Sequence, residues 1–284
     1  MDSGEKNKNS IPLVSFVVVT HNRPIELVQQ RIIESISNQD YSNKELILVG
    51  ESCEKLDALV KKIKEKQYDL KNFKWTNLSR PTGKMNYCIW GLVSRCRNIG
   101  IRLAEGEYIS CQDDDNEIKP DFASSLLRCI VENNAEAAWC FRKVKMPDGT
   151  PFKGDYFPWI ENAPHRERLV YQIWKDAGIF TPGSDVMKDQ LCASNKTEIF
   201  SSVDANEWLV KADVFRQFPY RERFGFSDIY SYLSFDDLWN TEIRKASVHA
   251  VCSGKVGLIY YLGGMSTSVS DSKFSHIHKK CSKK

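Results

Sequence analysis

The sequence predicts an α/β fold with a Rossmann-like, mostly parallel central sheet flanked by helices, and two observations lead to this prediction. The runs 13–20 and 45–50 are apolar, rich in β-branched residues and of strand length, as expected of strands covered on both faces. A segment with helical periodicity follows each run. This alternation builds a doubly wound layer, because each helix crosses one face of the sheet before the next strand begins.

Each predicted element of the first half is delimited by local signals. Asn22 and Pro24 mark the start of a helix after the first strand, and Pro147 to Gly149 form a turn after the last strand of this half. The predicted elements are, in order, strand 13–20, helix 25–38, strand 45–50, helix 56–66, strand 73–78, a helix that ends near residue 104, strand 107–111, helix 120–133 and strand 137–145.

The second half is less regular. Residues 147–197 are rich in Pro, Gly and aromatic residues with weak periodicity, which predicts a looped region that either closes over another part of the molecule or packs against the first half. The elements predicted after it are strand 198–203, a helix near 211–217, helix 236–246 and strand 256–262. No internal repeat and no long polar linker is present, so residues 1–284 are predicted to form a single domain.

Composition and charge narrow the class of protein. Of the 284 residues, 42% are hydrophobic and 27% charged, which is typical of a soluble globular protein, and the net charge of +3 is too small to indicate a nucleic-acid partner. The tail 271–284 is basic, with five lysines and two histidines from Lys273 onward. It is either a solvated end or a segment that contacts an anionic membrane surface peripherally.

The nine cysteines indicate a reducing environment. They include no C-x-x-C pair and their number is odd, so neither a zinc site nor a disulfide framework is expected. The N-terminus is polar, and no run of about 18 apolar residues occurs, so we expect a cytoplasmic protein without a membrane span, in peripheral contact with a membrane if the tail binds one.

The sharpest chemical feature is the run Asp113-Asp114-Asp115 directly after the predicted strand 107–111. Ligands of open parallel sheets bind beyond the carboxyl ends of the strands. Adjacent carboxylates repel one another, so a cation would offset their charge, and Mn²⁺ or Mg²⁺ prefers such hard oxygen ligands together with substrate phosphate oxygens. In an extended segment Asp113 and Asp115 project to the same side, as a diphosphate-bridging metal requires. Alternatively, the acids are solvated or cap the next helix.

The sequence lacks the glycines of two common nucleotide-binding motifs, the dinucleotide-binding motif and the P-loop. No G-x-G-x-x-G follows the first strand, which argues against a nicotinamide cofactor. Thr82-Gly83-Lys84 lacks the earlier glycine of a phosphate-binding P-loop.

Five segments, taken in order, resemble the family 2 glycosyltransferases, which have the GT-A fold and a D-x-D motif. They are 17–24 (VVVTHNRP), 45–49 (ELILV), 97–100 (RNIG), 104–109 (AEGEYI) and 113–115 (DDD). The resemblance covers residues 13 to 130 well and the remainder loosely. It implies a nucleotide-sugar-binding half at about 11–145, an acceptor-binding and catalytic half at about 146–270, and the basic tail 271–284.

The resemblance also implies a reaction and its cofactor. The expected reaction is an inverting transfer of a sugar from a nucleotide-sugar, with a UDP-sugar as the expected donor, to a hydroxyl of a saccharide or glycolipid acceptor, as in polysaccharide biosynthesis. The expected cofactor is Mn²⁺ or Mg²⁺. Two alternatives are a sugar nucleotidyltransferase, whose glycine- and Lys/Arg-rich phosphate loop is missing here, and a non-catalytic relative that binds carbohydrate or nucleotide.

Donor-side residues follow from the resemblance position by position. Glu51 is implied to meet the base or ribose, although the family usually has Asp-Asp where this chain has Gly50-Glu51. Arg97 is implied to approach the nucleotide or brace the acidic loop, unless it lies on a solvated helix face. The other implied ligands of the nucleotide-sugar are Thr20, Asn22, Arg23, Pro24, Asp113 and Asp114, and the implied metal ligands are Asp113 and Asp115.

On the acceptor side, Asp236 and Asp237 resemble the family's acidic pair, which supplies the general base; Asp236 is slightly favoured. Alternatively, they only stabilise the start of a helix. Glu207 and Trp208 are implied to border the acceptor, although Trp208, beside Leu and Val, also fits a core position. Many relatives carry a metal-binding His where this chain has Gly263 or Gly264.

Overall fold

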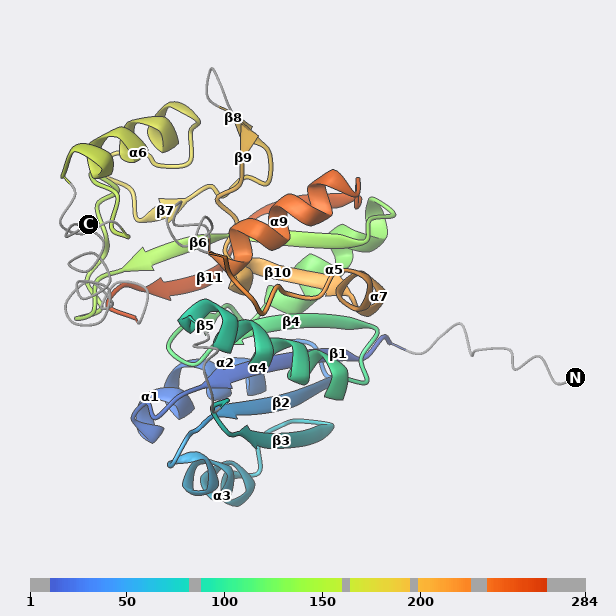
Figure 1. The fold of residues 1–284 in the computed structure, drawn as a ribbon. Coiled ribbons are helices and arrows are strands. Elements are labelled where there is room, and N and C mark those ends of the chain that lie inside the picture. The colour runs from blue at the N-terminus through green and yellow to red at the C-terminus, as the bar shows by residue number, and fades with distance from the viewer. Residues whose placement is uncertain (1–10, 82–87, 160–163, 195–198, 226–233, 265–284) are drawn as a thin grey trace, which may run out of the picture.

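The computed structural model describes residues 11–81, 88–159, 164–194, 199–225 and 234–264. Within these ranges one sheet has the strand order β3-β2-β1-β4-β10-β6-β11-β5, and β7 pairs with β6 (Figure 1). The strands are β1 (Val14–Thr20), β2 (Lys44–Glu51), β3 (Asn72–Leu78), β4 (Tyr108–Asp113), β5 (Glu117–Ile118), β6 (Ala137–Lys145), β7 (Val186–Met187), β10 (Trp208–Lys211) and β11 (Ala250–Tyr261).

The sheet is mostly parallel, as the sequence predicts. Strands β3, β2, β1 and β4 all pair in parallel, and so do β6 and β11. Strand β10 is antiparallel to both β4 and β6, and the short β5 is antiparallel to β11. The first four strands form the continuous parallel layer that the alternation of strands and helices indicates.

Helices cover both faces of the sheet, because alternate residues of β1 enter two separate cores. Phe16 and Val18 pack with α3 and α5 on one face, and Val17 packs with α4, α7 and α9 on the other (Figure 1). The helical segments are α1 (Ile25–Val28), the π-helical segment η1 (Gln29–Ile33), α2 (Glu34–Ser37), α3 (Leu56–Lys66), α4 (Ile89–Leu103), α5 (Phe122–Glu132), α6 (Pro164–Asp176), the 3₁₀ turn η2 (Ala205–Glu207), α7 (Ala212–Gln217) and α9 (Phe235–Lys245).

Helix α4 approaches β1 closely at Gly100. A Cβ atom at this position would lie 2.2 Å from Cγ1 of Val17, so only glycine permits the contact. This packing fixes the preceding turn of α4, which carries Arg97, against the middle of the sheet.

The prediction that residues 147–197 form a looped region is partly wrong. It contains helix α6, whose Trp174 packs against Phe157 and Phe180 with ring centroids 4.9 and 5.7 Å apart. Aromatic contacts with distant residues, which do not register as helical periodicity, hold this helix in place. The predicted strand 198–203 is reduced to the two-residue β9 (Ile199–Phe200), which pairs with β8 (Ala193–Ser194); residue 198 and the basic tail lie outside the described residues.

The described part of the chain also bears on the pairing of cysteines and on membrane-spanning helices. Its cysteines are all free thiols. No helix in it is long and apolar enough to cross a membrane.

Candidate active site

The carboxyl ends of β1, β2 and β4 meet at one edge of the sheet, because these strands are parallel and in register. Val19 pairs with Asp113, and Thr20 pairs with Gly50. Ligands of open parallel sheets bind beyond this edge. The structure therefore brings the acidic run of 113–115 close to the turn after β1 and to the end of β2.

Asp113, the last residue of β4, is held by two side chains from distant parts of the chain. Its Oδ1 accepts a 2.6 Å hydrogen bond from Nη2 of Arg97, and its Oδ2 accepts a 2.8 Å bond from Nδ2 of Asn206. Arg97 is fully buried, so it does not lie on a solvated helix face. Burial disfavours its charge, but Asp113 offsets this and raises the pKa of the guanidinium. Arg97 braces the acidic run, while the Asp113 side chain stays 37% exposed.

Asp114 turns toward the protein. Its Oδ2 accepts a 2.7 Å hydrogen bond from Oγ1 of Thr20, and its Oδ1 accepts a 3.1 Å bond from Nε of Arg23. Burial raises the pKa of Asp114, while Arg23 opposes the rise. Thr20, Arg23 and Asp114 thus join the turn after β1 to the turn after β4, and both Asp114 oxygens are used for this purpose.

Asp115 faces a small cavity of about 160 Å³ at the same edge. Its Oδ2 forms an ion pair with Nη2 of Arg23, and its backbone oxygen accepts a 2.7 Å hydrogen bond from Nη1 of Arg31. A Cβ atom at Gly264, one of the two glycines at which the resemblance implies a histidine in relatives, would lie 3.0 Å from Oδ2 of Asp115. The cavity is lined by Arg23, Leu27, Arg31, Asp115, Pro147, Tyr261, Leu262, Gly263 and Gly264.

The chemistry of Asp113 and Asp115 fits a divalent cation. Burial raises the pKa of Asp115 to about 7, with the charge of Asp113 adding to the rise and Arg23 opposing it. A cation beside both carboxylates would relieve this repulsion, and their oxygens are the ligands that Mn²⁺ and Mg²⁺ prefer. Among the described residues no group of three or more His, Cys, Asp or Glu is arranged to hold a metal. Phosphate oxygens and water are the ligands that such an ion commonly takes beside one or two carboxylates.

The end of β2 presents an ion pair instead of a free acid. Both oxygens of Glu51 accept from Arg80, at 2.9 Å from Nε and 2.8 Å from Nη2, and Nδ1 of His21 lies 3.0 Å from Oε2. These bonds, chiefly the one from Arg80, hold the pKa of Glu51 below its usual value. Glu51 is only 5% exposed, whereas the Arg80 side chain is 51% exposed. Arg80 is therefore the more accessible member of this ion pair at the end of β2.

Asn22 and Pro24 shape the turn after β1. Asn22 adopts a left-handed conformation with φ of 49°, and its Oδ1 accepts a 2.8 Å hydrogen bond from the backbone nitrogen of Glu54. Pro24 is exposed and precedes the first residue of α1. Together they fix the turn that carries Arg23 to the acidic run.

The second acidic pair begins helix α9. Ser234 and Asp237 form a capping box, in which the backbone nitrogen of Ser234 donates to Oδ2 of Asp237 at 3.0 Å. Ser234 Oγ also donates to Oδ1 of Asp236. Burial raises the pKa of Asp236 to about 7, and Asp237 adds to the rise. The guanidinium carbon of Arg97 lies 4.6 Å from the centre of the Phe235 ring, and the charge of Arg97 slightly opposes the rise in the pKa of Asp236.

The two residues implied to border the acceptor are interior instead. Trp208 is fully buried, and its ring centroid lies 5.3 Å from that of Trp139 and 5.5 Å from that of Trp239. It is a core residue, the alternative that its apolar neighbours had left open. Glu207 is also fully buried, and its Oε2 accepts a 2.6 Å hydrogen bond from the backbone of Asp204. Burial raises its pKa well above the usual value. Neither side chain reaches the surface where an acceptor could contact it.

Three residues of this edge, Arg80, Arg31 and Asn206, were not among the site residues predicted from the sequence. Arg80 lies just beyond the carboxyl end of β3, where the strand-end rule applied to that strand would have drawn attention to it. Arg31 and Asn206 contact Asp115 and Asp113 across 84 and 93 positions of the chain. Separations of this size leave no local pattern to detect.

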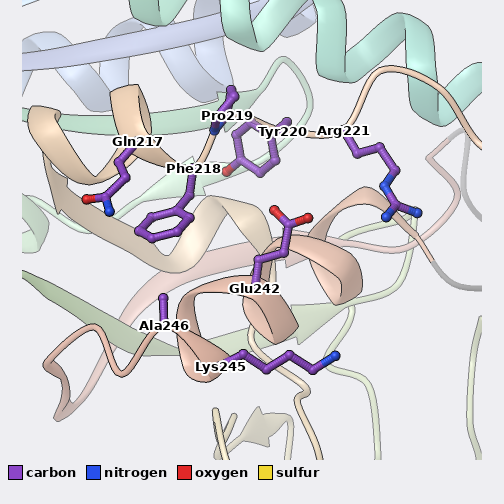
Figure 2. A pocket seen from close by; sticks show the side chains of 8 residues that line it. All are labelled: Gln217, Phe218, Pro219, Tyr220, Arg221, Glu242, Lys245 and Ala246. Atoms are coloured by element: carbon purple, nitrogen blue, oxygen red, sulfur yellow. The ribbon is translucent and has the colours of Figure 1, made fainter.

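A separate cavity of about 620 Å³ lies between the segment after α7 and the second half of α9. Figure 2 shows Phe218 and Arg221 on one side and Glu242 and Lys245 of α9 on the other. None of the predicted site residues lines it, so the strand-end edge remains the candidate site.

A family model described as glycosyl transferase family 2 matches residues 15–190. A putative colanic acid biosynthesis glycosyl transferase, WcaA of Escherichia coli K12, is 34% identical over 119 residues, which are 41% of this chain and 37% of the relative. A GalNAc(5)-diNAcBac-PP-undecaprenol beta-1,3-glucosyltransferase of Campylobacter jejuni is 28% identical over 127 residues, 44% of this chain and 37% of the relative. The chain thus matches less than half the length of these relatives.

Solved structures share the fold at low sequence identity. S. aureus TarS 1–349 in complex with UDP-GlcNAc has a TM-score of 0.53 and 15% identity, with 94% of this chain and 64% of that chain covered. The mannosyltransferase PcManGT from Pyrobaculum calidifontis, in complex with GDP-Man and Mn²⁺, has a TM-score of 0.51 and 15% identity, with 93% of this chain and 66% of that chain covered. These similarities confirm the predicted GT-A fold.

Proposed function

Because the chain belongs to glycosyltransferase family 2, we propose that it is an inverting, metal-dependent enzyme that transfers a sugar from a nucleotide-sugar to a hydroxyl group. A UDP-sugar is the proposed donor, and a saccharide or glycolipid is the proposed acceptor. The observation that carries this proposal is the position of Asp113 and Asp115 at the carboxyl end of β4, beside the ends of β1 and β2.

The acidic run and its partners account for the donor half of the reaction. Asp113 and Asp115 would hold Mn²⁺ or Mg²⁺, which when bound stabilises negative charge on a departing diphosphate. Arg97 and Asn206 fix the Asp113 carboxylate, and Arg23 fixes Asp115, so the ligands are oriented before the donor arrives. Such preorganisation avoids reorientation of the side chains during the reaction.

The start of α9 accounts for the acceptor half. The acceptor oxygen attacks the anomeric carbon as the bond from that carbon to the diphosphate breaks, and the hydroxyl proton passes to a carboxylate oxygen of Asp236 or Asp237. A general base works best when its pKa lies near the operating pH, and burial raises the pKa of Asp236 to about 7. The attack and the departure occur on opposite faces of the sugar, so the anomeric configuration inverts.

The similar proteins support the choice of ligands. The structures of TarS with UDP-GlcNAc and of PcManGT with GDP-Man and Mn²⁺ have this fold. The Campylobacter relative is named for an undecaprenol-linked acceptor, which favours a glycolipid acceptor and an enzyme that works close to a membrane. The basic tail 271–284 would be the part of the chain that attracts an anionic membrane surface.

The direct test is a transfer assay with a panel of nucleotide-sugars, with Mn²⁺ and with a chelator. The proposal predicts release of a nucleoside diphosphate that depends on a divalent ion. Undiminished transfer after chelation would rule out the metal role. Release of pyrophosphate would instead identify a nucleotidyltransferase, and glycan binding without nucleotide binding would identify a non-catalytic relative.

A further inference from the structure

Strand β4 loses its neighbour on one side before it reaches Asp113. Strand β10 pairs with β4 only at Tyr108 and Ile109, and the turn η2 lies beside the last residues of β4. Asn206 of η2 takes the place of the missing strand. Its backbone oxygen accepts a 2.8 Å hydrogen bond from Nε2 of Gln112, and its side-chain Oδ1 accepts a 2.5 Å bond from the backbone nitrogen of Asp113.

The same amide also holds the carboxylate. Nδ2 of Asn206 donates to Oδ2 of Asp113 at 2.8 Å, and Arg97 donates to Oδ1 at 2.6 Å. Each oxygen therefore has one fixed donor, and a carboxylate oxygen can accept more than one such bond. The Asp113 side chain remains 37% exposed. The remaining lone pairs of its two oxygens can therefore bind a ligand, and the two hydrogen bonds fix the direction in which they point.

Asn206 is itself held in this orientation. Oδ1 of Asp204 accepts hydrogen bonds from both Nδ2 and the backbone nitrogen of Asn206, at 2.5 and 2.9 Å. A carboxylate only accepts, so the amide nitrogen and not its oxygen must face Asp204. Oδ2 of Asp204 accepts in turn from Nη1 of Arg142 at 3.0 Å, and Nη2 of Arg142 donates to Asp189 at 3.1 Å. The support of Asp113 thus extends into the second half of the chain.

We propose that Asn206 is a positioning residue, which acts through Asp113 by fixing the direction in which its carboxylate faces the donor and its metal ion. This inference rests on the proposed function, since it gives Asp113 a ligand to face. Residues that hold a metal ligand through a hydrogen bond change metal affinity or activity by about 10- to 100-fold when they are removed.

The test is the affinity for UDP, measured by calorimetry with Mn²⁺ and with a chelator, in wild type and Asn206→Ala. The expected result is an about 10- to 100-fold smaller gain in affinity from Mn²⁺ in the variant. Gln39→Ala is the matched control, because Gln39 is also a buried amide, with bonds to Ser35, Lys119 and Ala123, but does not contact the acidic run. Its gain from Mn²⁺ should equal that of wild type.

A double-mutant cycle separates positioning from general destabilisation. If Asn206 acts through Asp113, Asn206→Ala causes no further loss in an Asp113→Asn background, because the interaction is already gone. An equal loss in both backgrounds, or a gain from Mn²⁺ in Asn206→Ala that matches the Gln39→Ala control, overturns the inference. If Asn206→Ala does not fold, Asp204→Asn gives the same test with a smaller expected loss, since it keeps an N-cap but weakens the hold on the Asn206 amide.

The positioning role of Asn206 can be tested even if the proposed function is wrong. If wild type binds no UDP under either condition, the proposed donor is wrong, and crystal structures of wild type and Asn206→Ala decide about Asn206. An Asp113 carboxylate that leaves Arg97 or turns in the variant supports the positioning role. A carboxylate with unchanged orientation overturns it.

Discussion

The two acidic groups at this edge of the molecule are held in opposite ways. The run 113–115 is bound by Thr20, Arg23, Arg97 and Asn206, all of which are distant in the sequence. Asp236 and Asp237 are bound by Ser234, two and three residues away, within the first turn of α9. The first group therefore exists only when the whole sheet is assembled, whereas the second takes its local geometry from one helix end.

The two groups nevertheless share one property. In each of them burial raises the pKa of one carboxyl, Asp115 or Asp236, to about 7. Cationic partners surround the first, so it suits the binding of a metal ion and a diphosphate. Asp236 accepts a hydrogen bond from the Ser234 hydroxyl and lies beside Asp237, while the charge of Arg97 has a smaller influence on its pKa than these neighbours. Its raised pKa suits a group that takes up a proton. The difference in partners, and not in residue type, separates the two proposed tasks.

Removal of a carboxylate from the strand-end run should have the largest effect. Asp115→Asn should lower kcat/KM by roughly 10⁴-fold, because help from the metal at the leaving group contributes several kcal/mol. Asp121→Asn, a nearby acid at the start of α5, is the control and should leave the rate unchanged. Steady-state assays at saturating Mn²⁺ provide the measurement. A normal rate in Asp115→Asn contradicts the role given to the run.

Removal of the base should have the next largest effect. Asp236→Asn or Asp237→Asn, whichever removes the base, should lower kcat by roughly 10³-fold, within the range of general-base catalysis. The other variant should cost less, because it changes only the helix cap. Measurement of kcat and of nucleotide affinity in both variants separates the two acidic groups, since neither change at α9 should weaken UDP binding. If both variants keep wild-type kcat, the pair only caps the helix.

The pH dependence of kcat should distinguish the two acidic groups, because only the proposed base should determine it. A base must be deprotonated, and burial raises the pKa of Asp236 to about 7, so kcat should fall as the pH drops below 7, by about tenfold per pH unit. Saturating Mn²⁺ favours the charged form of Asp115, so its titration should not contribute to this limb. If Asp236 is the base, Asp237→Asn should move the limb to lower pH, because the charge of Asp237 helps to raise the pKa of Asp236. If the pH at which kcat falls is the same in Asp237→Asn as in wild type, a group other than Asp236 causes the fall.

A smaller effect is expected at the end of β2. Arg80→Ala should change the affinity for UDP by about fivefold, because a partly exposed ion pair contributes at most about 1 kcal/mol. The same variant tests whether the Arg80 and Glu51 pair contributes to base preference, by comparison of UDP with GDP. Lys62→Ala removes an exposed ion pair with Glu26, away from this edge, and serves as the control. Identical affinities in both variants would remove Arg80 from the nucleotide site.

The smallest effect on the reaction should come from Trp208. Trp208→Ala should lower the free energy of unfolding by about 3–5 kcal/mol, because it leaves a cavity between Trp139 and Trp239. Activity per folded molecule should stay close to wild type, as should the KM for the acceptor. Trp75→Ala, at a side chain that is 40% exposed, should cost much less stability. Denaturant melts and acceptor titrations distinguish the outcomes. A specific rise in acceptor KM would restore Trp208 to the acceptor site.

The first half of the chain was predictable because its signals are local. The apolar runs of β1 and β2 indicate buried strands, and the acidic run directly follows the apolar residues of β4. Parallel pairing then brings the strand ends together without further information.

The second half of the chain was less predictable because long-range contacts determine its structure. Helix α6 is held by aromatic residues such as Phe157 and Phe180. Trp208 could be placed in the core or at the acceptor until its neighbours Trp139 and Trp239 were known. Asn206 replaces part of a strand beside β4, which no spacing of residues in the sequence indicates.

The proposed metal site is tested most directly by a crystal of the protein with Mn²⁺ and UDP, with diffraction data collected at the manganese absorption edge. If Asp113 and Asp115 hold the ion, an anomalous peak lies within coordinating distance of both carboxylates and of the diphosphate of UDP. A bound UDP with no such peak, or with manganese away from both aspartates, would contradict the proposed metal site.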